Sequence, residues 1–349
     1  MKSEFKTSRR SLLRDTIKFA GFTAASRLLP VGTTSPNASA QTKAVPEKEG
    51  ENGSTLILLG TQGGPGVTLT RSQTASLLIV ENRQYLVDCG YGTLRALVQA
   101  GLGFNNLSNI FLTHLHNDHT SDVAALLSHK WSSGRTRETT VYGPYGTAKL
   151  VNSAVLFFEA DAEIRIINEG RPAIPESLFH GKDFDVAGIT EIFRDEYVVV
   201  KAVENTHYPE RAKKQMPHRS FAYRFDTATR SVVFSGDTAY SENLVLLSRD
   251  ADIFLCETRG LPQRRQLNRA KTDAEGKESI GLHVMETHST TEDVGRMATK
   301  ARVKTVVLNH LLGGGSSKDA LEAFESKLAS SVNQFFSGSV IVGRDQMRI

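Results

Sequence analysis

Cysteine is scarce in this sequence, and long hydrophobic runs are missing from it. The 349 residues include two cysteines, Cys89 and Cys256, which are too few for a disulfide framework, and neither belongs to a CxxC metal-binding pair. Both lie in apolar, strand-like runs, so we expect each to be a small core residue, with a disulfide between them left open. A mildly apolar run at residues 19–29 is too short and too polar to span a bilayer as a stable helix.

A basic excess is also missing once the N-terminal segment is set aside. The whole sequence carries a formal net charge of +4, with 42 basic and 38 acidic residues. Residues 1–40 contain seven of the basic and two of the acidic residues, so the remainder holds 35 basic and 36 acidic residues and a net charge of −1. Such a near-neutral protein lacks the excess of positive charge that binds the phosphates of a nucleic acid. The composition therefore weakens the case for a nucleic-acid substrate.

The first 40 residues resemble an export signal. Arg9 and Arg10 precede the mildly apolar run, as in a twin-arginine signal, and residues 38–40 form an Ala-x-Ala cleavage site. This organisation implies a periplasmic or secreted protein with no membrane anchor after cleavage. A disordered basic tail is the alternative interpretation of the same residues. We predict three regions: a twin-arginine signal peptide at residues 1–40, a polar linker at 41–54 and one globular domain at 55–349.

Histidine, in contrast, is concentrated in one short stretch. Three of the ten histidines and one aspartate fall within the six residues from His114 to His119. The apolar run at residues 109–112 has the character of a buried strand, and the apolar positions of residues 123–127 have helical spacing. The cluster therefore lies in a strand-to-helix loop, where several side chains can converge on one point. Imidazole and carboxylate are preferred zinc ligands, so the loop is a candidate metal site rather than a polar turn.

The arrangement of these residues is similar to a known family signature. His114, His116, Asp118 and His119 match the H-x-H-x-D-H pattern of the metallo-β-lactamase superfamily. The resemblance extends from about Leu56 to Ile349 and implies an α/β fold, the αββα sandwich, with two sheets packed face to face and helices outside. Periodicity alone does not separate this fold from other α/β layers. Further segments resemble the ribonuclease Z and arylsulfatase branch of the superfamily: residues 59–65 with Arg71, residues 86–90 and residues 142–144.

The resemblance also implies two zinc ions held by residues from both halves of the chain. Three more ligand-type residues, His207, Asp237 and His310, each follow an apolar strand-like run, so they fall at one edge of a sheet. By analogy with the family, the two ions share Asp237, and imidazole and carboxylate ligands suit Mn²⁺ or Fe²⁺ as well as Zn²⁺. The implied ligands are His114, His116 and His207 for one ion, and Asp118, His119 and His310 for the other.

Asp118 and His288 are the candidate catalytic residues. The segment at residues 286–290 resembles the family histidine that assists departure of the leaving oxygen, and a capping box predicted at residues 289–292 places His288 just before a helix. A solvent-exposed histidine near a helix cap is the alternative. The other histidines have no expected role at the site: His218 and His283 in flexible loops, and His129 and His180 in structural or surface positions.

These features predict an exported, dinuclear zinc-dependent hydrolase of a small ester. A phosphodiester or an (aryl)sulfate ester is the first choice of substrate, and a lactone or carboxylic ester follows, with attack by a water that the metals activate. We expect a small anionic ester as partner and no stable nucleic-acid complex, and a homodimer is left open. The long, locally basic segment from Arg259 to Lys277 is expected over the site, as an anion-recruiting surface, a lid or a solvated loop.

The main alternative is a tRNA 3′-processing endonuclease, that is, a ribonuclease Z. The export motif, the near-neutral domain and the middle of the chain argue against it. Residues 160–182 have a mixed, loop-like pattern and lack the Gly-, Pro- and Lys-rich arm that grips the substrate in ribonuclease Z. A β-lactamase, an iron-dependent redox enzyme and a non-catalytic binding module fit less well, because the ligand set is complete and the flanking segments resemble the other branch.

Overall fold

The computed structural model describes residues 53–134, 137–171, 174–261, 280–313 and 317–349. The described residues fall within one compact unit, which spans residues 44–349. The predicted signal peptide and nearly all of the predicted linker lie outside the described residues, and all of the described elements belong to this unit. Within the described part of the chain, no helix has the length and apolar character that crossing a membrane requires.

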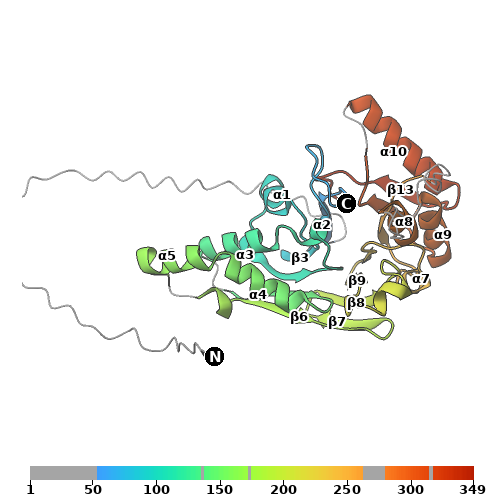
Figure 1. Ribbon diagram of the computed structural model, residues 1–349. Helices are drawn as coiled ribbons and strands as arrows, with labels where there is room; N and C mark the ends of the chain where they lie inside the picture. Colours follow the sequence, from blue (N-terminus) through green and yellow to red (C-terminus); the bar gives the residue numbers. More distant parts are fainter. Residues whose placement is uncertain (1–52, 135–136, 172–173, 262–279, 314–316) are drawn as a thin grey trace, which may run out of the picture. The chain divides into compact units, whose positions relative to one another are not determined.

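The described residues form two β-sheets that pack face to face (Figure 1). In the first sheet the spatial order follows the chain, and antiparallel pairing among β1, β2 and β3 gives way to parallel pairing from β3 to β6. Its strands are β1 (Ser54–Gly60), β2 (Ala75–Val80), β3 (Arg83–Val87), β4 (Leu107–Phe111), β5 (Thr139–Gly143) and β6 (Phe179–Asp183).

The second sheet has the order β13–β12–β11–β10–β9–β8–β7. Pairing is parallel from β10 to β13 and antiparallel from β7 to β10, so β8, β10 and β12 all run in the same direction. Their C-terminal ends therefore meet at one edge of the sheet. The strands are β7 (Thr190–Arg194), β8 (Val198–Glu204), β9 (Phe221–Thr227), β10 (Ser231–Phe234), β11 (Ile253–Glu257), β12 (Thr305–Asn309) and β13 (Ser339–Val342).

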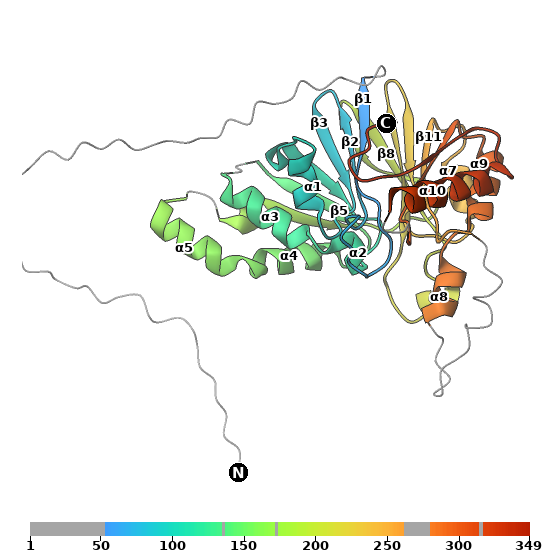
Figure 2. The ribbon, with the colours of Figure 1, turned by 90° about the horizontal axis from the view of Figure 1, so that it is seen from above.

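Helices cover the outer face of each sheet, as the view from above shows (Figure 2). The helices on the first sheet are α1 (Thr93–Gln99), α3 (Val123–Ser132), α4 (Thr147–Phe157) and α5 (Glu159–Glu169). Those on the second sheet are α7 (Glu242–Leu247), α9 (Thr291–Ala301) and α10 (Lys318–Asn333). Short helical segments occupy the connections: α2 (Asn117–Thr120), α6 (Glu210–Lys213), α8 (Ile280–Thr287), and the 3₁₀ turns η1 (Phe104–Asn106) and η2 (Pro175–Ser177).

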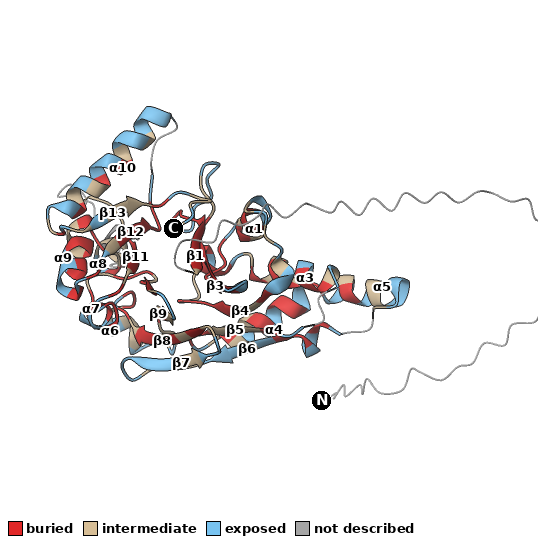
Figure 3. Cartoon of the chain, turned by 180° about the vertical axis from the view of Figure 1, so that it is seen from behind, coloured by how far each residue is buried: buried red, intermediate tan, exposed pale blue. Residues whose placement is uncertain are grey.

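Strand alternation produces three apolar layers, one between the sheets and one beneath each set of helices. In β4, Ile110 points to the helices of the first sheet, whereas its neighbour Phe111 points into the space between the sheets. There Phe111 stacks on Tyr142 with ring centroids 5.0 Å apart and meets Phe225 of the other sheet edge-on at 5.2 Å. The buried strands between exposed helical faces are visible in Figure 3. The fold is therefore the predicted αββα sandwich.

The loop-like interpretation of residues 160–182 is wrong. This stretch contains most of α5, the turn η2 and most of β6. The helix was missed because it buries little apolar surface: Ala162 is its buried residue, while Ile164 and Ile167 are 57% and 82% exposed. The strand was missed because β6 lies at the edge of its sheet, and most of its residues are polar and solvent-accessible. Neither segment shows the apolar periodicity that sequence interpretation depends on.

Both cysteines are free and buried in different parts of the core. Cys89 packs under the helices of the first sheet, and Cys256 lies in β11 beneath those of the second. Burial raises the pKa of both thiols, so neither has the character of a reactive thiolate. The prediction of two small core residues is confirmed, and the disulfide that had been left open is not formed.

Candidate metal centre

The predicted ligands come from loops at the C-terminal ends of strands in both sheets. His114 and His116 follow β4, and Asp118 and His119 begin the short helix α2 directly after them. From the second sheet, His207 follows β8, Asp237 follows β10 and His310 follows β12. Parallel strands deliver their C-terminal loops to the same edge, so all seven side chains converge between the two sheets.

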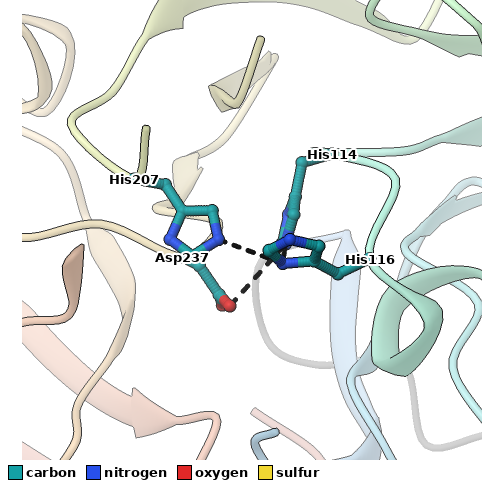
Figure 4. A group of neighbouring side chains, drawn as sticks. All are labelled: His114, His116, His207 and Asp237. Carbon is teal, nitrogen blue, oxygen red and sulfur yellow. Dashed lines mark hydrogen bonds and ion pairs between the residues drawn. The ribbon is translucent and has the colours of Figure 1, made fainter. Parts of the chain in front are cut away.

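The first cluster contains His114, His116, His207 and Asp237 (Figure 4). Its ligand-type atoms all lie within 4.8 Å of one another. The Nδ1 atom of His116 is 3.1 Å from Nε2 of His114 and 3.1 Å from Nε2 of His207. Burial is the largest influence on the pKa values of these three histidines and lowers all of them. The imidazoles are thus held neutral, which is the form that binds a metal.

The second cluster contains Asp118, His119, Asp237 and His310, all of them buried. His310 Nε2 is 3.3 Å from Asp118 Oδ2 and 3.1 Å from Asp237 Oδ2, and His119 Nε2 is 3.3 Å from Asp237 Oδ1. Asp237 therefore belongs to both clusters. Such a shared carboxylate is the position from which one side chain can bind two cations at once.

The second cluster attracts positive charge strongly. Burial alone would raise the pKa of Asp118, but its hydrogen bond with His310 and its attraction to His119 outweigh burial and lower that pKa to about 2. Burial alone would lower the pKa of His310, but Asp237 and Asp118 outweigh it and raise that pKa to about 10. Protons or a metal cation can supply this charge.

Two poorly satisfied polar atoms support a metal. The buried atoms His119 Nε2 and Asp237 Oδ1 lie 3.3 Å apart, but neither makes a well-aligned hydrogen bond with a described residue. A buried polar atom that lacks a good hydrogen bond is costly, and both atoms belong to the second cluster, where a cation would pair with them. Imidazole nitrogen and carboxylate oxygen suit divalent metals. The residues present therefore fit divalent metal ions.

A buried carboxylate that the sequence interpretation gave no role holds the ligands in place. Asp88, just after β3, accepts a hydrogen bond of 2.8 Å from the Thr113 backbone N–H and lies 2.8 Å from Nδ1 of His119. This contact orients the His119 ring so that Nε2 faces the cluster, as carboxylates behind metal-binding histidines commonly do. Thr113 Oγ1 is 3.1 Å from Nδ1 of His114, and the Thr287 carbonyl is 3.3 Å from Nδ1 of His207.

Two residues of the site have a left-handed backbone. Asp88 has φ 60° and His310 has φ 53°, a conformation that costs non-glycine residues about 1 kcal/mol or more. Such conformations persist where surrounding contacts determine them, and they cluster at functional sites. Gly63 in the β1–β2 connection packs against His310: a Cβ there would lie 2.3 Å from Nδ1 of the imidazole. A side chain at Gly63 would therefore displace His310.

His288 lies beside the second cluster and is paired with Glu257. Nδ1 of His288 is 3.0 Å from Glu257 Oε1, and its ring stacks on that of His310 with centroids 5.5 Å apart. The same Glu257 oxygen accepts hydrogen bonds from the backbone N–H groups of Thr238 and Ser289. Burial would lower the pKa of His288, but Glu257 outweighs it and the pKa is raised. Sequence interpretation missed Glu257, because it ends a buried strand without any motif.

The capping box lies one residue later than predicted. Thr290 is the N-cap of α9, its side chain accepts from the Asp293 backbone N–H, and the Asp293 carboxylate accepts from the Thr290 backbone N–H. His288 is therefore two residues before the cap, and its side chain is 12% exposed at the site rather than in solvent. The alternative of a solvent-exposed cap histidine is wrong.

The remaining histidines divide between the site and the surface. His283, expected in a flexible loop, lies in α8, and its ring centroid is 5.9 Å from His207. With His207 and His288 it forms a further group of neighbouring nitrogen ligands. His129 and His180 are exposed, as expected. Most of the predicted basic segment 259–277 lies outside the described residues, but Arg259 itself donates to the His288 carbonyl at 3.2 Å.

The αββα sandwich holds two buried His/Asp clusters that share a carboxylate. The family described as the beta-lactamase superfamily domain matches residues 83–311, well over half of the chain. The chain belongs to this family, and the family, the fold and the site together identify a metal-dependent hydrolase of ester bonds.

Several relatives are similar over most of their length. Ribonuclease Z of Mycobacterium sp. (strain KMS) is 29% identical over 261 residues, which cover 74% of this chain and 84% of the relative. Ribonuclease Z of Archaeoglobus fulgidus is 27% identical over 321 residues, which cover 82% and 94%.

Solved structures share the fold. The metallo-beta-lactamase fold protein YhfI from Bacillus subtilis has a TM-score of 0.60 and 18% identity, and the match covers 85% of this chain and 99% of YhfI. The short form of human tRNase Z has a TM-score of 0.56 and 22% identity, and the match covers 84% of this chain and 98% of the human protein.

Proposed function

We propose that this protein is a dinuclear metal-dependent phosphodiesterase whose substrates are phosphodiesters of ribonucleotides. The observation that carries the proposal is the pair of ligand clusters sharing Asp237, with His288 beside them. Two divalent cations held at this place would lower the pKa of a nucleophilic water and offset the negative charge that develops during hydrolysis. We assign the ligand roles to the seven residues His114, His116, Asp118, His119, His207, Asp237 and His310, and the metals to zinc.

His288, positioned by Glu257, donates the proton that the leaving oxygen needs. The contact with Glu257 at Nδ1 fixes the His288 ring and favours its protonated form. A protonated imidazole that faces the site can donate to the oxygen that leaves phosphorus. Glu257 is a positioning residue, because it acts on the substrate through His288. Asp118 was also expected to be catalytic, and its buried place among the ligands supports the role of a ligand that polarises the nucleophile.

The relatives support RNA over the small ester that charge and the export motif suggested. The curated relatives compared above are named ribonuclease Z, and the match covers most of each. For the choice of substrate, the near-neutral charge of the domain therefore counts for less than the similarity of the whole domain to these relatives. The arylsulfatase part of the resemblance stays a prediction, as does a homodimer. A ribonuclease cleaves a phosphodiester bond, and a phosphodiester was also the first choice among the small esters predicted from the sequence.

Substrate comparison tests the proposal. We expect zinc-loaded protein to hydrolyse the dinucleotide UpU and a pre-tRNA with a 3′ trailer, as the relatives named ribonuclease Z suggest. It should hydrolyse p-nitrophenyl sulfate and p-nitrophenyl acetate at least about 10²-fold less efficiently in kcat/KM. Product analysis and release of p-nitrophenol give the rates. Efficient cleavage of the sulfate or carboxylic ester without cleavage of either phosphodiester substrate would contradict the proposal. Cleavage of UpU but not of pre-tRNA would restrict it to small substrates.

We also propose that the chain is exported by the twin-arginine route, as a signal peptide at residues 1–40, a linker at 41–54 and a hydrolase domain at 55–349. Support comes from Arg9 and Arg10 ahead of the mildly apolar run. The double variant Arg9→Lys with Arg10→Lys is expected to leave most of the protein in the cytoplasm, measured by cell fractionation. Arg14→Lys, outside the pair, serves as the control and should be exported normally. Unchanged export of the double variant would refute the assignment.

A further inference from the structure

A cavity of about 420 Å³ opens beside the first ligand cluster. It is large enough for a small organic group, since small-molecule sites begin at roughly 300 Å³. His116 lines the cavity and belongs to the first cluster, so the cavity is continuous with the candidate metal centre. The rest of its wall comes from Leu115 beside His116, from the β8–β9 connection, which includes α6 and His218, and from His283 on α8.

The wall of this cavity is aromatic and apolar near the metal centre. Tyr208 is buried, and its ring centroid lies 5.7 Å from that of His116 and 4.9 Å from that of His207. Leu115, Ala212 and Met216 add aliphatic surface. Aromatic rings bind other rings by offset or edge-on contact in such surroundings. The cavity therefore suits a planar ring better than a charged or strongly hydrated group.

An exposed ion pair spans the rim of the cavity. Arg211 of α6 donates to Glu286 of α8 at 2.8 Å. The charge of Arg211 is thus matched by a carboxylate, so the rim does not present an isolated cation to a phosphate. Figure 2 shows α8 at the end of the strands where α2 and the ligand loops lie.

We propose that this cavity binds the planar ring of the substrate group that stays on the phosphate after hydrolysis, either a nucleobase or an aryl ring. The proposal rests on the phosphodiesterase function proposed above. His116, a member of the first ligand cluster, lines the cavity, whereas His288, which serves the leaving oxygen, is not among the described residues that line it. His283 of the wall has its ring centroid 6.3 Å from that of His288, so the cavity begins beside the group that serves the leaving oxygen. In this assignment the retained group lies towards His116 and Tyr208, and the leaving group lies at His288.

Binding of the retained-group products to zinc-loaded protein tests this assignment without requiring turnover. The first pair of probes is phenyl phosphate and methyl phosphate, and the second pair is uridine 5′-phosphate and ribose 5-phosphate. Burial of one ring should make the ring-bearing member of a pair bind about 10–150-fold more tightly, measured as the ratio of Kd values by titration calorimetry. A preference in the first pair identifies an aryl ring as the occupant, and one in the second pair identifies a nucleobase.

Filling the cavity should remove that preference. Ala212→Trp places a large ring in the cavity from α6, and we expect the ratio of Kd values to fall by about tenfold or more. Ala160→Trp, on the exposed side of α5, is the matched control and should keep the ratio. Equal binding within both pairs in the unmodified protein, or an unchanged ratio in Ala212→Trp, would overturn the assignment.

Hydrolysis of phenyl p-nitrophenyl phosphate by the same samples separates the two proposals. A ring preference that Ala212→Trp abolishes, without any hydrolysis, would reject the phosphodiesterase function and leave the cavity as the ring-binding part of a phosphate-ester site. Hydrolysis without a ring preference would reject the assignment of the cavity and leave the phosphodiesterase function standing.

Discussion

Replacing His288 by alanine is expected to lower kcat for UpU by about 10²–10⁴-fold, the usual effect of losing a positioned general acid. The leaving group of UpU is a ribose hydroxyl, which needs a proton as its bond to phosphorus breaks. Nδ1 of His288 is engaged by Glu257, so the proton for the substrate comes from the other ring nitrogen. Metal content should stay the same, because seven other residues are assigned the ligand roles. Elemental analysis of the purified variant checks this.

The leaving group and the pH profile distinguish an acid from a structural histidine. For bis-p-nitrophenyl phosphate, whose leaving group departs without a proton, the loss in His288→Ala should be much smaller. Glu257→Gln removes the attraction that raises the pKa of His288. The protonated form is then lost at lower pH, so the alkaline limb of the kcat profile for UpU should move to lower pH. Equal losses on both substrates, or loss of metal from His288→Ala, would show that His288 is not the acid.

Asp237→Ala is expected to lower kcat/KM for every substrate by about 10³-fold or more and to reduce the bound metal from about two ions per chain. Asp237 is the only residue present in both main ligand clusters of the described chain. Without its carboxylate, His119 and His310 lose their closest shared anion, and the second cluster loses much of its attraction for cations.

A surface aspartate provides the control for this prediction. Asp250 is exposed and pairs with Arg302 far from the ligand loops, so Asp250→Ala should keep both metal and activity. Circular dichroism should show a folded protein for both variants. If Asp237→Ala kept two ions per chain and full activity, Asp237 would not be the shared ligand.

Much of the site could be predicted from sequence because its ligands follow the ends of apolar strands. His207, Asp237 and His310 each come directly after a run that forms β8, β10 or β12. Strand ends are identified by hydrophobic pattern, and the family order of residues assigns them to one site. The αββα fold followed from the same resemblance. The structure brings all of these side chains together, and we propose that they are the metal ligands.

The residues behind the ligands were harder to predict. Asp88 directly follows the buried strand β3, and Glu257 is the last residue of β11. A carboxylate in such a place has no sequence spacing that reveals which histidine it contacts. Contacts with His119 and His288 span 31 residues of sequence in each case and depend on tertiary packing. His283 was placed in a loop because the polar sequence before it obscured the short helix α8. Local pattern carries no information about such contacts.

The placement of the ligands on both sheets has a consequence for folding stability. Asp118 and His310 are separated by 192 residues of sequence, yet Oδ2 and Nε2 lie 3.3 Å apart. An ion bound by both would act as a removable cross-link between the two halves of the sandwich. In the chain-entropy description, closing a loop of this length restricts the unfolded chain by about 5 kcal/mol. With Cys89 and Cys256 free, this cross-link would do what a disulfide does elsewhere, and it would work equally in reducing and oxidising surroundings. A chelator would open it without breaking a covalent bond.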